Sequence, residues 1–174
     1  VEAVRSGGWD GDVVVLNPWR PGDDAATALL SDCRVITTVS RADDLRRIAD
    51  AAPGSRVIVE LLTSMLRHGV TPAEAADLDL SGLALEGWAI HLPATGSLAE
   101  ARELASAPQV EAPFWLSHLS LDDYQWFSAE SSVPTRMRVG TRLWLGDKQA
   151  YRTTATVLDV HRVSRGTPLG YHQG

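Results

Sequence analysis

Lysine and cysteine are nearly absent from this sequence of 174 residues, and each scarcity narrows the possible chemistry. Cys33 is the only cysteine, which excludes an internal disulfide and a cysteine metal cluster and fits a reducing compartment such as the cytoplasm. Lys148 is the only lysine among the 16 basic residues, and all the others are arginine. A reaction that needs a lysine amine therefore has a single candidate within this sequence.

Long apolar runs, a basic balance and the common catalytic patterns are also missing. No apolar run is long enough to cross a bilayer, so the sequence predicts no membrane span. The net charge of −6 argues against binding to nucleic acid, which usually needs a basic face. There is no glycine-rich nucleotide loop, no GxSxG elbow, and no pair of histidines at the helix spacing of a metal site.

What the sequence does contain is a regular alternation of strand-like and helix-like segments. Apolar, strand-like runs are expected at residues 13–16, 34–39, 56–62, 83–92, 114–120 and 137–146. Helix-like stretches separate them, including one over residues 41–52 that we expect Ser40 to cap. This order predicts βαβ units and a parallel sheet. The fold class is α/β, a (β/α)8 TIM-type barrel whose two remaining strands would lie upstream of Val1.

The character of the sequence changes after Gly146. Residues 151–163 are rich in β-branched residues in rough alternation, and a turn and a further strand-like run follow instead of a helix. We therefore predict a partial barrel over residues 1–147 and the beginning of an antiparallel β domain over residues 148–174. Because the first residues read as the end of a helix, and the last ones stop just after a strand, we expect a piece of a longer protein.

Four polar residues come from four successive strand regions: Arg67, His91, His118 and Arg138. Taken singly, a histidine near a strand end is more often a hydrogen-bonded structural residue, and an isolated arginine is usually a surface charge. In a parallel α/β barrel, however, the carboxyl ends of the strands form the active face. The four together therefore predict a common pocket at one mouth of the barrel.

The segments that carry these residues resemble the alanine racemase family, in the family's order and over nearly the whole chain. RVIVELLTSMLRHGV resembles LKVDTGMxRLGV, LEGWAIHLP resembles EGxxTHFA, SHLS resembles HxANS, and MRVGTRLWLG resembles VRPGIxLYG. The last 21 residues or so resemble the opening of the family's second domain, where Tyr171 falls on the catalytic tyrosine.

The resemblance implies an enzyme that uses pyridoxal 5'-phosphate (PLP) to racemise an amino acid, with alanine as the default substrate. The Cα proton is removed on one face and returned on the other by two bases. Tyr171 would be one base, delivered across the interface of a homodimer, with His91 as its proton partner. Arg67 would neutralise the substrate carboxylate or the cofactor phenolate.

The resemblance also assigns residues to the cofactor. Arg138 would bond to His91 and face the pyridine nitrogen, keeping it unprotonated, and His118 would complete this network. Backbone N–H groups at Gly140 and Thr141, with the region of Ser120, would hold the phosphate.

The sequence departs from the family at several of these places. Leu62 and Ser64 replace the aspartate and first glycine of DTGM, and Leu121 and Asp122 replace the asparagine and serine of HxANS, where a carboxylate would repel a phosphate. Glu60 falls where many members have a lysine, often carbamylated, and could supply the same negative charge. The family's cofactor lysine would lie upstream of Val1, and Lys148 lies in a polar stretch between the two predicted domains. We therefore expect no covalent adduct of PLP with this chain alone.

Two alternatives remain open on the sequence. One is a racemase-like protein that binds PLP or a related ligand without racemase activity, and the other is a PLP-free barrel of different chemistry.

Overall fold

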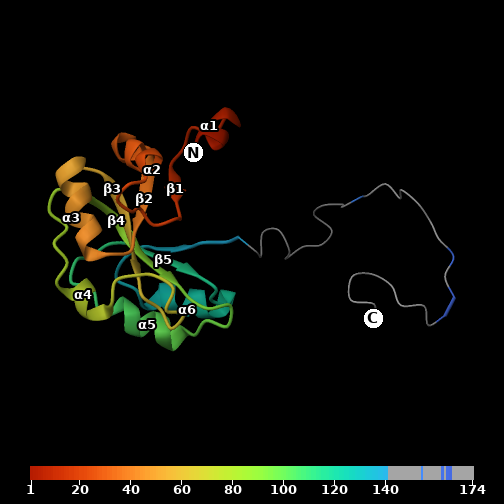
Figure 1. Cartoon of the computed structure of the whole chain (residues 1–174). Coiled ribbons are helices and arrows are strands. Elements are labelled where there is room, and N and C mark those ends of the chain that lie inside the picture. Colours follow the sequence, from red (N-terminus) through yellow and green to blue (C-terminus); the bar gives the residue numbers. More distant parts are fainter. Residues whose placement is uncertain (141–153, 155–161, 163, 166–174) are drawn as a thin grey trace. The chain divides into compact units, whose positions relative to one another are not determined.

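The computed structural model describes residues 1–140 together with residues 154, 162, 164 and 165. The described strands form one sheet in the order β1-β2-β3-β4-β5-β6, and every neighbouring pair is parallel (Figure 1). The strands are β1 (Val13–Val15), β2 (Val35–Val39), β3 (Arg56–Leu61), β4 (Ala84–His91), β5 (Phe114–Ser117) and β6 (Thr135–Met137). The sheet curls into half of a barrel, which confirms the α/β prediction to the extent of a partial TIM-type barrel.

Helices connect the strands, as a parallel sheet in sequence order requires. The connecting helices are α2 (Asp24–Ala28), α3 (Ala42–Ala51), α4 (Pro72–Ala76), α5 (Leu98–Ala105) and α6 (Leu121–Glu130), with a short 3-10 turn at Leu29–Ser31, and α1 (Glu2–Ser6) precedes β1. Thr71 opens α4 with a full capping box to Glu74. The predicted cap of α3 was wrong by one residue: Arg41 is the N-cap, and no side chain caps that helix.

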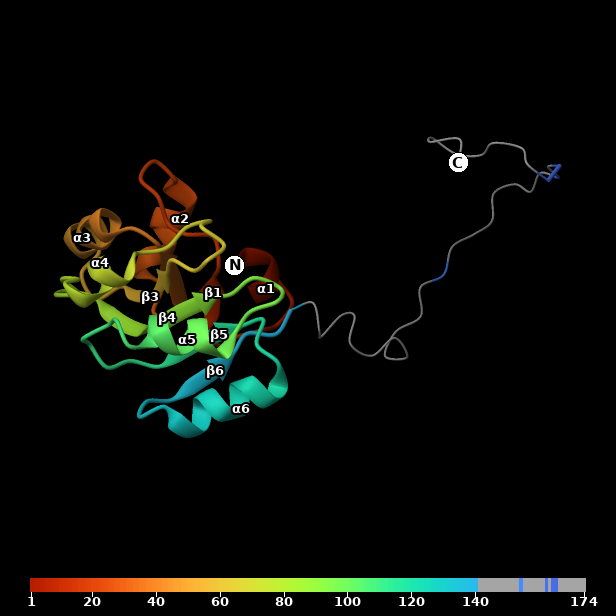
Figure 2. The ribbon, with the colours of Figure 1, turned by 90° about the horizontal axis from the view of Figure 1, so that it is seen from below.

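The sheet has one face against the helices and one smaller apolar cluster on the other face. Leu45 and Ile48 of α3, Leu104 of α5 and Phe127 of α6 belong to the main core with alternate residues of the strands. Residues of the smaller cluster come from five successive strands: Val14, Ile36, Ile58, Ala89 and Trp115. This smaller cluster marks the inner face of the half-barrel. Figure 2 shows α6 lying outside β6, where Thr135 bonds to Tyr124.

A bulge in β4 decides which of its side chains turn inward. Val57 pairs with Leu85 and Ile58 pairs with Gly87, so Glu86 is an extra residue. Before the bulge, the odd-numbered Leu85 lies on the side of the main core. After it, the even-numbered Trp88 and Ile90 lie on that side, because the extra residue reverses the alternation. Gly87 has φ +151°, and a Cβ there would lie 2.3 Å from the carbonyl oxygen of Pro113, so only glycine fits.

The sixth strand starts earlier than the sequence predicted. It covers Thr135–Met137 because these residues pair in parallel with residues 114–116 of β5, and Arg138 follows its end. Residues 141–146 of the predicted run lie outside the described part. So does nearly all of the predicted β domain, and the boundary at 147/148 remains a prediction.

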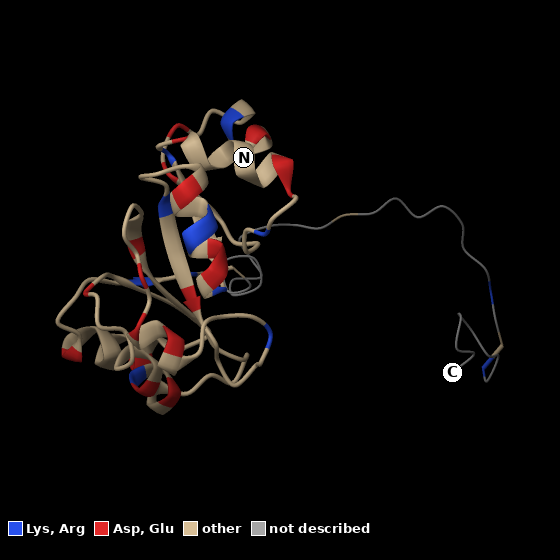
Figure 3. Ribbon diagram, turned by 60° about the vertical axis from the view of Figure 1, so that its left-hand side comes forward, with Lys and Arg blue, Asp and Glu red and all other residues tan. Residues whose placement is uncertain are grey.

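Charged residues of both signs mix over the described part, and α3 carries aspartates and arginines in close succession (Figure 3). At the amino ends of the strands, Arg56 bonds to Glu86 at 2.6 Å and to both carboxylate oxygens of Asp12 at 2.9 Å. These carboxylates hold the pKa of Arg56 above its usual range. None of the helices among the described residues combines the length and apolar character that crossing a membrane requires.

Candidate functional site

Polar side chains form the next layer of the inner face, at the carboxyl ends of the strands. They are Glu60 of β3, His91 of β4, Ser117 of β5, and Arg138 just after β6. Each follows by two positions a residue of the layer beneath, namely Ile58, Ala89, Trp115 and Arg136, whose guanidinium stacks 4.8 Å from the Trp115 ring. Side chains two apart in a strand share a face, so the alternation itself brings this layer together.

Three of these side chains are joined by hydrogen bonds. Ser117 Oγ lies 2.9 Å from His91 Nδ1, in agreement with the pairing of these two residues across β4 and β5. Arg138 Nη2 lies 3.1 Å from His91 Nδ1 and donates to Ser117 Oγ at 3.1 Å. The backbone N–H of Arg138 donates to the carbonyl of Leu116 at 2.7 Å, which extends the strand pairing by one step.

His118 lies beside this group but not in the same layer. Its ring meets that of His91 edge to face, with 5.0 Å between the centroids, and its side chain is exposed. The backbone of His118 has φ +66°, which is uncommon for a residue with a side chain. This turn at the end of β5 explains why adjacent residues, Ser117 and His118, both approach His91.

Glu60 provides a buried negative charge on the inner face. Its carboxylate is 4% exposed and lies 3.8 Å from Arg67 Nη2. His68 Nδ1 approaches it to 3.2 Å, but without the direction of a hydrogen bond. Burial and Arg67 lower the pKa of His68, so we interpret this contact as one with a neutral ring. Burial raises the pKa of Glu60, and Arg138 and Arg67 act against that rise.

The loop after β3 brings Arg67 back to Glu60. Val70 N donates to the Glu60 carbonyl, and Leu62 N donates to the Val70 carbonyl, both at 2.8 Å. Gly69 makes this return possible, since it has φ +141° and a Cβ there would meet Leu62 N at 2.4 Å. Glu100 of α5 holds the start of the loop by accepting from Ser64 N and Ser64 Oγ.

Burial and the positive groups around His91 keep its ring neutral. Burial is the largest cause, followed by the charges of Arg138 and Arg67 and by His118 and His68, and together they lower the pKa of His91 to about 4. Burial also lowers the pKa of Arg138, but an arginine stays charged at neutral pH. The site therefore combines the positive charges of Arg67 and Arg138 and the carboxylate of Glu60 with neutral imidazole rings.

We expect the depressed pKa of His91 to appear as acid sensitivity of the fold. As pH falls below 6.5 the unfolded chain binds a proton at this histidine, whereas the folded chain resists it down to about 4. The free energy of unfolding should fall across that window and should not change above it on account of His91. In urea titrations between pH 4 and 7, His91→Gln should show a shallower loss than the unmodified chain, and equal slopes would contradict the assignment.

Four of the residues singled out from the sequence lie near one another, and one member of this group was missed. The structure brings Arg67, His91, His118 and Arg138 to the same end of the half-barrel. Ser117 was overlooked, although the alternation of β5 places it on the same face as Trp115, a signal that the sequence does contain. Tyr171 and Thr141 lie outside the described residues.

Comparison with known proteins identifies the family and the fold. The family model described as alanine racemase, N-terminal domain, matches residues 1–112. The chain belongs to this family. A comparison with curated proteins gives no match.

Solved structures share the fold at low sequence identity. SrLDC in complex with PLP and cadaverine superposes with a TM-score of 0.56 at 18% identity, over 78% of this chain and 45% of that one. Alanine racemase of Clostridium difficile 630 in complex with cycloserine gives a TM-score of 0.48 at 17% identity, over 78% of this chain and 37% of that one. At such identity the likeness concerns the fold alone. The chain spans less than half the length of either structure.

The end of the site near Arg138 fits the ring of PLP, the cofactor that the family resemblance implied. Arg138 Nε is buried and has no hydrogen-bond partner among the described residues. An unpaired buried donor is costly, and the unprotonated ring nitrogen of PLP is an acceptor that would satisfy it.

Ser120 fits the phosphate of the cofactor less well than Arg138 fits its ring. This residue caps α6, and its hydroxyl donates to the carboxylate of Asp123 at 2.7 Å. Asp122 adds a second acid to the first turn of the same helix. Gly140 is exposed, and no atom lies within 4 Å of where its Cβ would be. The Ser120 hydroxyl is engaged within its own helix and lies beside two acids, which does not favour a bond from it to a phosphate.

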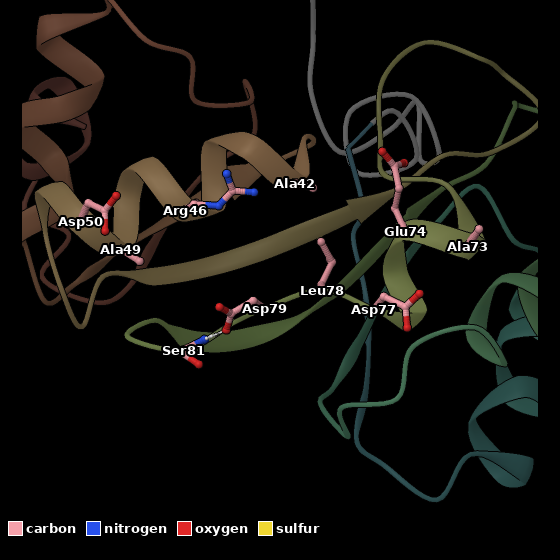
Figure 4. Close-up of a pocket in the computed structure, with 10 residues that line it drawn as sticks. All are labelled: Ala42, Arg46, Ala49, Asp50, Ala73, Glu74, Asp77, Leu78, Asp79 and Ser81. Atoms are coloured by element: carbon pink, nitrogen blue, oxygen red, sulfur yellow. Dashed lines mark hydrogen bonds between the residues drawn. The ribbon is translucent and has the colours of Figure 1, made fainter.

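The described residues also form a hollow on the outer side, unrelated to this site. It has a volume of about 680 Å³ and lies between α3, α4 and the segment before β4 (Figure 4). Its charged lining consists of one arginine and four acids: Arg46, Asp50, Glu74, Asp77 and Asp79. Within the described part of the chain, no group of histidine, cysteine and acidic residues is placed to hold a metal ion.

Proposed function

We propose that this chain forms much of the cofactor-binding barrel of a PLP-dependent amino-acid racemase, with alanine as the default substrate. The observation that carries the proposal is the joined group of Arg138, His91 and Ser117 on the inner face of a barrel of the alanine racemase family. Arg138 Nε next to it has no partner in the described part of the chain, which supports a ring-nitrogen acceptor as ligand.

Each residue has a part in the proposed reaction. PLP, when bound, withdraws electrons from the Cα of an attached amino acid and so makes the Cα proton acidic. Arg138 would hold the ring nitrogen by hydrogen bonding, and its fixed charge would keep a proton off that nitrogen. His91, neutral near pH 7, would orient the residue that exchanges the substrate proton. We propose Tyr171 of a second copy for that exchange, in a homodimer.

Arg67 would bind a carboxylate in this scheme. It is about half exposed, and its partner Glu60 is 3.8 Å away, so the pair is loose enough for the guanidinium to reach a ligand. A substrate carboxylate offers the two oxygens that an arginine prefers. His118, exposed beside His91, would close the same side of the site.

A second candidate, a racemase-like protein that binds PLP without racemising, is favoured by the acids near Ser120. Asp122 and Asp123 would weaken the hold on the phosphate. The two candidates differ in turnover and not in cofactor binding, which makes them separable by experiment.

The test uses a protein that contains this chain and the remainder of the barrel. We expect a visible absorption band from bound PLP and the formation of D-alanine from L-alanine. Binding without D-alanine would favour the second candidate, and the absence of PLP binding would overturn both. For the 174-residue chain alone, mass analysis after borohydride reduction with PLP should find no adduct at Lys148, and a stable adduct there would contradict our placement of the cofactor lysine.

A further inference from the structure

The hydroxyl of Ser117 lies between the two other members of the hydrogen-bonded group, His91 and Arg138. Ser117 is 5% exposed, and its oxygen lies within hydrogen-bond distance of both His91 Nδ1 and Arg138 Nη2. Neither the family resemblance nor the strand-end argument pointed to this residue.

The hydrogen-bond donors among Arg138, Ser117 and His91 determine which ring nitrogen of His91 carries the proton. A guanidinium has only N–H donors, and Arg138 Nη2 has two hydrogens, which are directed to Ser117 Oγ and His91 Nδ1 at 3.1 Å each. His91 Nδ1 must then accept, and the proton of the neutral ring must lie on Nε2. A proton on Nδ1 would set two N–H donors against each other at 3.1 Å.

Ser117 adds two hydrogen bonds to the one between Arg138 and His91. Its oxygen accepts the second hydrogen of Arg138 Nη2, which fixes the rotation of the guanidinium. Its own hydrogen is then free to be donated to His91 Nδ1 at 2.9 Å, where Ser117 and Arg138 share the single lone pair of that nitrogen. Among the described residues, no partner occupies Nε2 of His91.

We propose that Ser117 is a positioning residue that, together with Arg138, holds His91 as the Nε2–H tautomer. In this state His91 presents a hydrogen-bond donor to an oxygen of a ligand or of a partner residue, and it cannot itself accept a proton there. The consequence for catalysis rests on the proposed function, whereas the tautomer does not.

The other groups that face His91 agree with this state. Burial acts most strongly against a positive charge on the ring, followed by Arg138, Arg67, His118 and His68, and together they lower the pKa of His91 to about 4. Glu60, the negative group nearby, acts on Arg138 and is engaged with Arg67. The neutral form, and with it a single tautomer, should therefore persist over the whole physiological range.

The tautomer can be measured in the 174-residue chain by long-range ¹H–¹⁵N spectra of the histidine rings. Five histidines contribute signals, and a His91→Asn variant identifies those of His91. We expect the Nε2–H form in the unmodified chain and in Ser117→Thr, which keeps the hydroxyl. In Ser117→Ala the ratio of Nε2–H to Nδ1–H should fall by about fivefold, the effect of losing one neutral hydrogen bond. Ser106→Ala, at the end of α5, is the matched control.

The outcomes separate the inference from the proposed function. An Nδ1–H ring in the unmodified chain, or an unchanged ratio in a folded Ser117→Ala variant, overturns the role of Ser117. If Ser117→Ala does not fold, Ser117→Cys replaces it, because a thiol of similar size is a weak hydrogen-bond partner and the same loss is expected. None of these measurements uses PLP or turnover, so a failure of the racemase proposal would leave them intact.

Discussion

Replacing Arg138 with methionine is expected to lower turnover of the complete enzyme by about 10²- to 10³-fold, the usual effect of removing one preorganised electrostatic donor. Arg138 joins His91, Ser117 and the charge of Glu60. Methionine has a similar length without charge, and Glu60 keeps Arg67 at 3.8 Å, which limits the cost of removing one of the charges around it. We expect a variant that still folds, checked by circular dichroism, and a lower affinity for PLP, measured by absorbance titration.

Arg136→Met is the matched control for this change. Arg136 lies on the same face two residues earlier, is exposed, and stacks on Trp115. Its loss should alter turnover by less than about threefold, since an exposed cation–π contact contributes little. Equal losses in the two variants, or an Arg138→Met enzyme with normal PLP affinity and turnover, would show that Arg138 only supports the fold.

Glu60→Gln is expected to separate stability from function. Burial raises the pKa of Glu60, so its folded form favours the proton more than the unfolded form does. The stability it contributes is complete below its unfolded pKa and is lost as pH rises through the folded pKa. Glutamine removes that loss, and the free energy of unfolding at pH 7 should equal or exceed that of the unmodified chain.

The same substitution, Glu60→Gln, should lower PLP affinity or turnover. Without the carboxylate, Arg67 loses its partner at 3.8 Å and the charges of Arg67 and Arg138 are unbalanced. We expect a loss of about 10- to 100-fold in PLP affinity or turnover, typical of a hydrogen bond or contact to a charged group. Unchanged values for both would contradict our hypothesis that Glu60 supplies a negative charge to the site.

Glu86→Gln is the control, because we expect it to affect stability and not turnover. Glu86 lies on the next strand and bonds to Arg56 at 2.6 Å, at the amino ends of the strands and away from the site. We expect this variant to lose stability, because the half-buried arginine loses a partner, and to keep its turnover. A pair of variants with opposite effects excludes a general response to the removal of an acid.

The sequence predicted the order of the elements because the signals for them are local. Apolar runs of strand length, a capping box at Thr71 and serine caps act within a few residues. The structure agrees with the first five predicted strands to within a few positions, whereas β6 overlaps its prediction only at Met137 among the described residues. Local signals also place a polar residue at the end of a strand, which is how Arg67, His91, His118 and Arg138 were found.

Only the tertiary structure decided which of these side chains share a face and which touch. The extra residue Glu86 in β4 reverses the alternation, so that His91 points to the inner side beside Ser117. Gly69 closes a loop that returns Arg67 to the buried Glu60. Bulges, loop closure and strand register arise from contacts between segments far apart in the chain, and no short stretch of sequence contains both partners of such a contact.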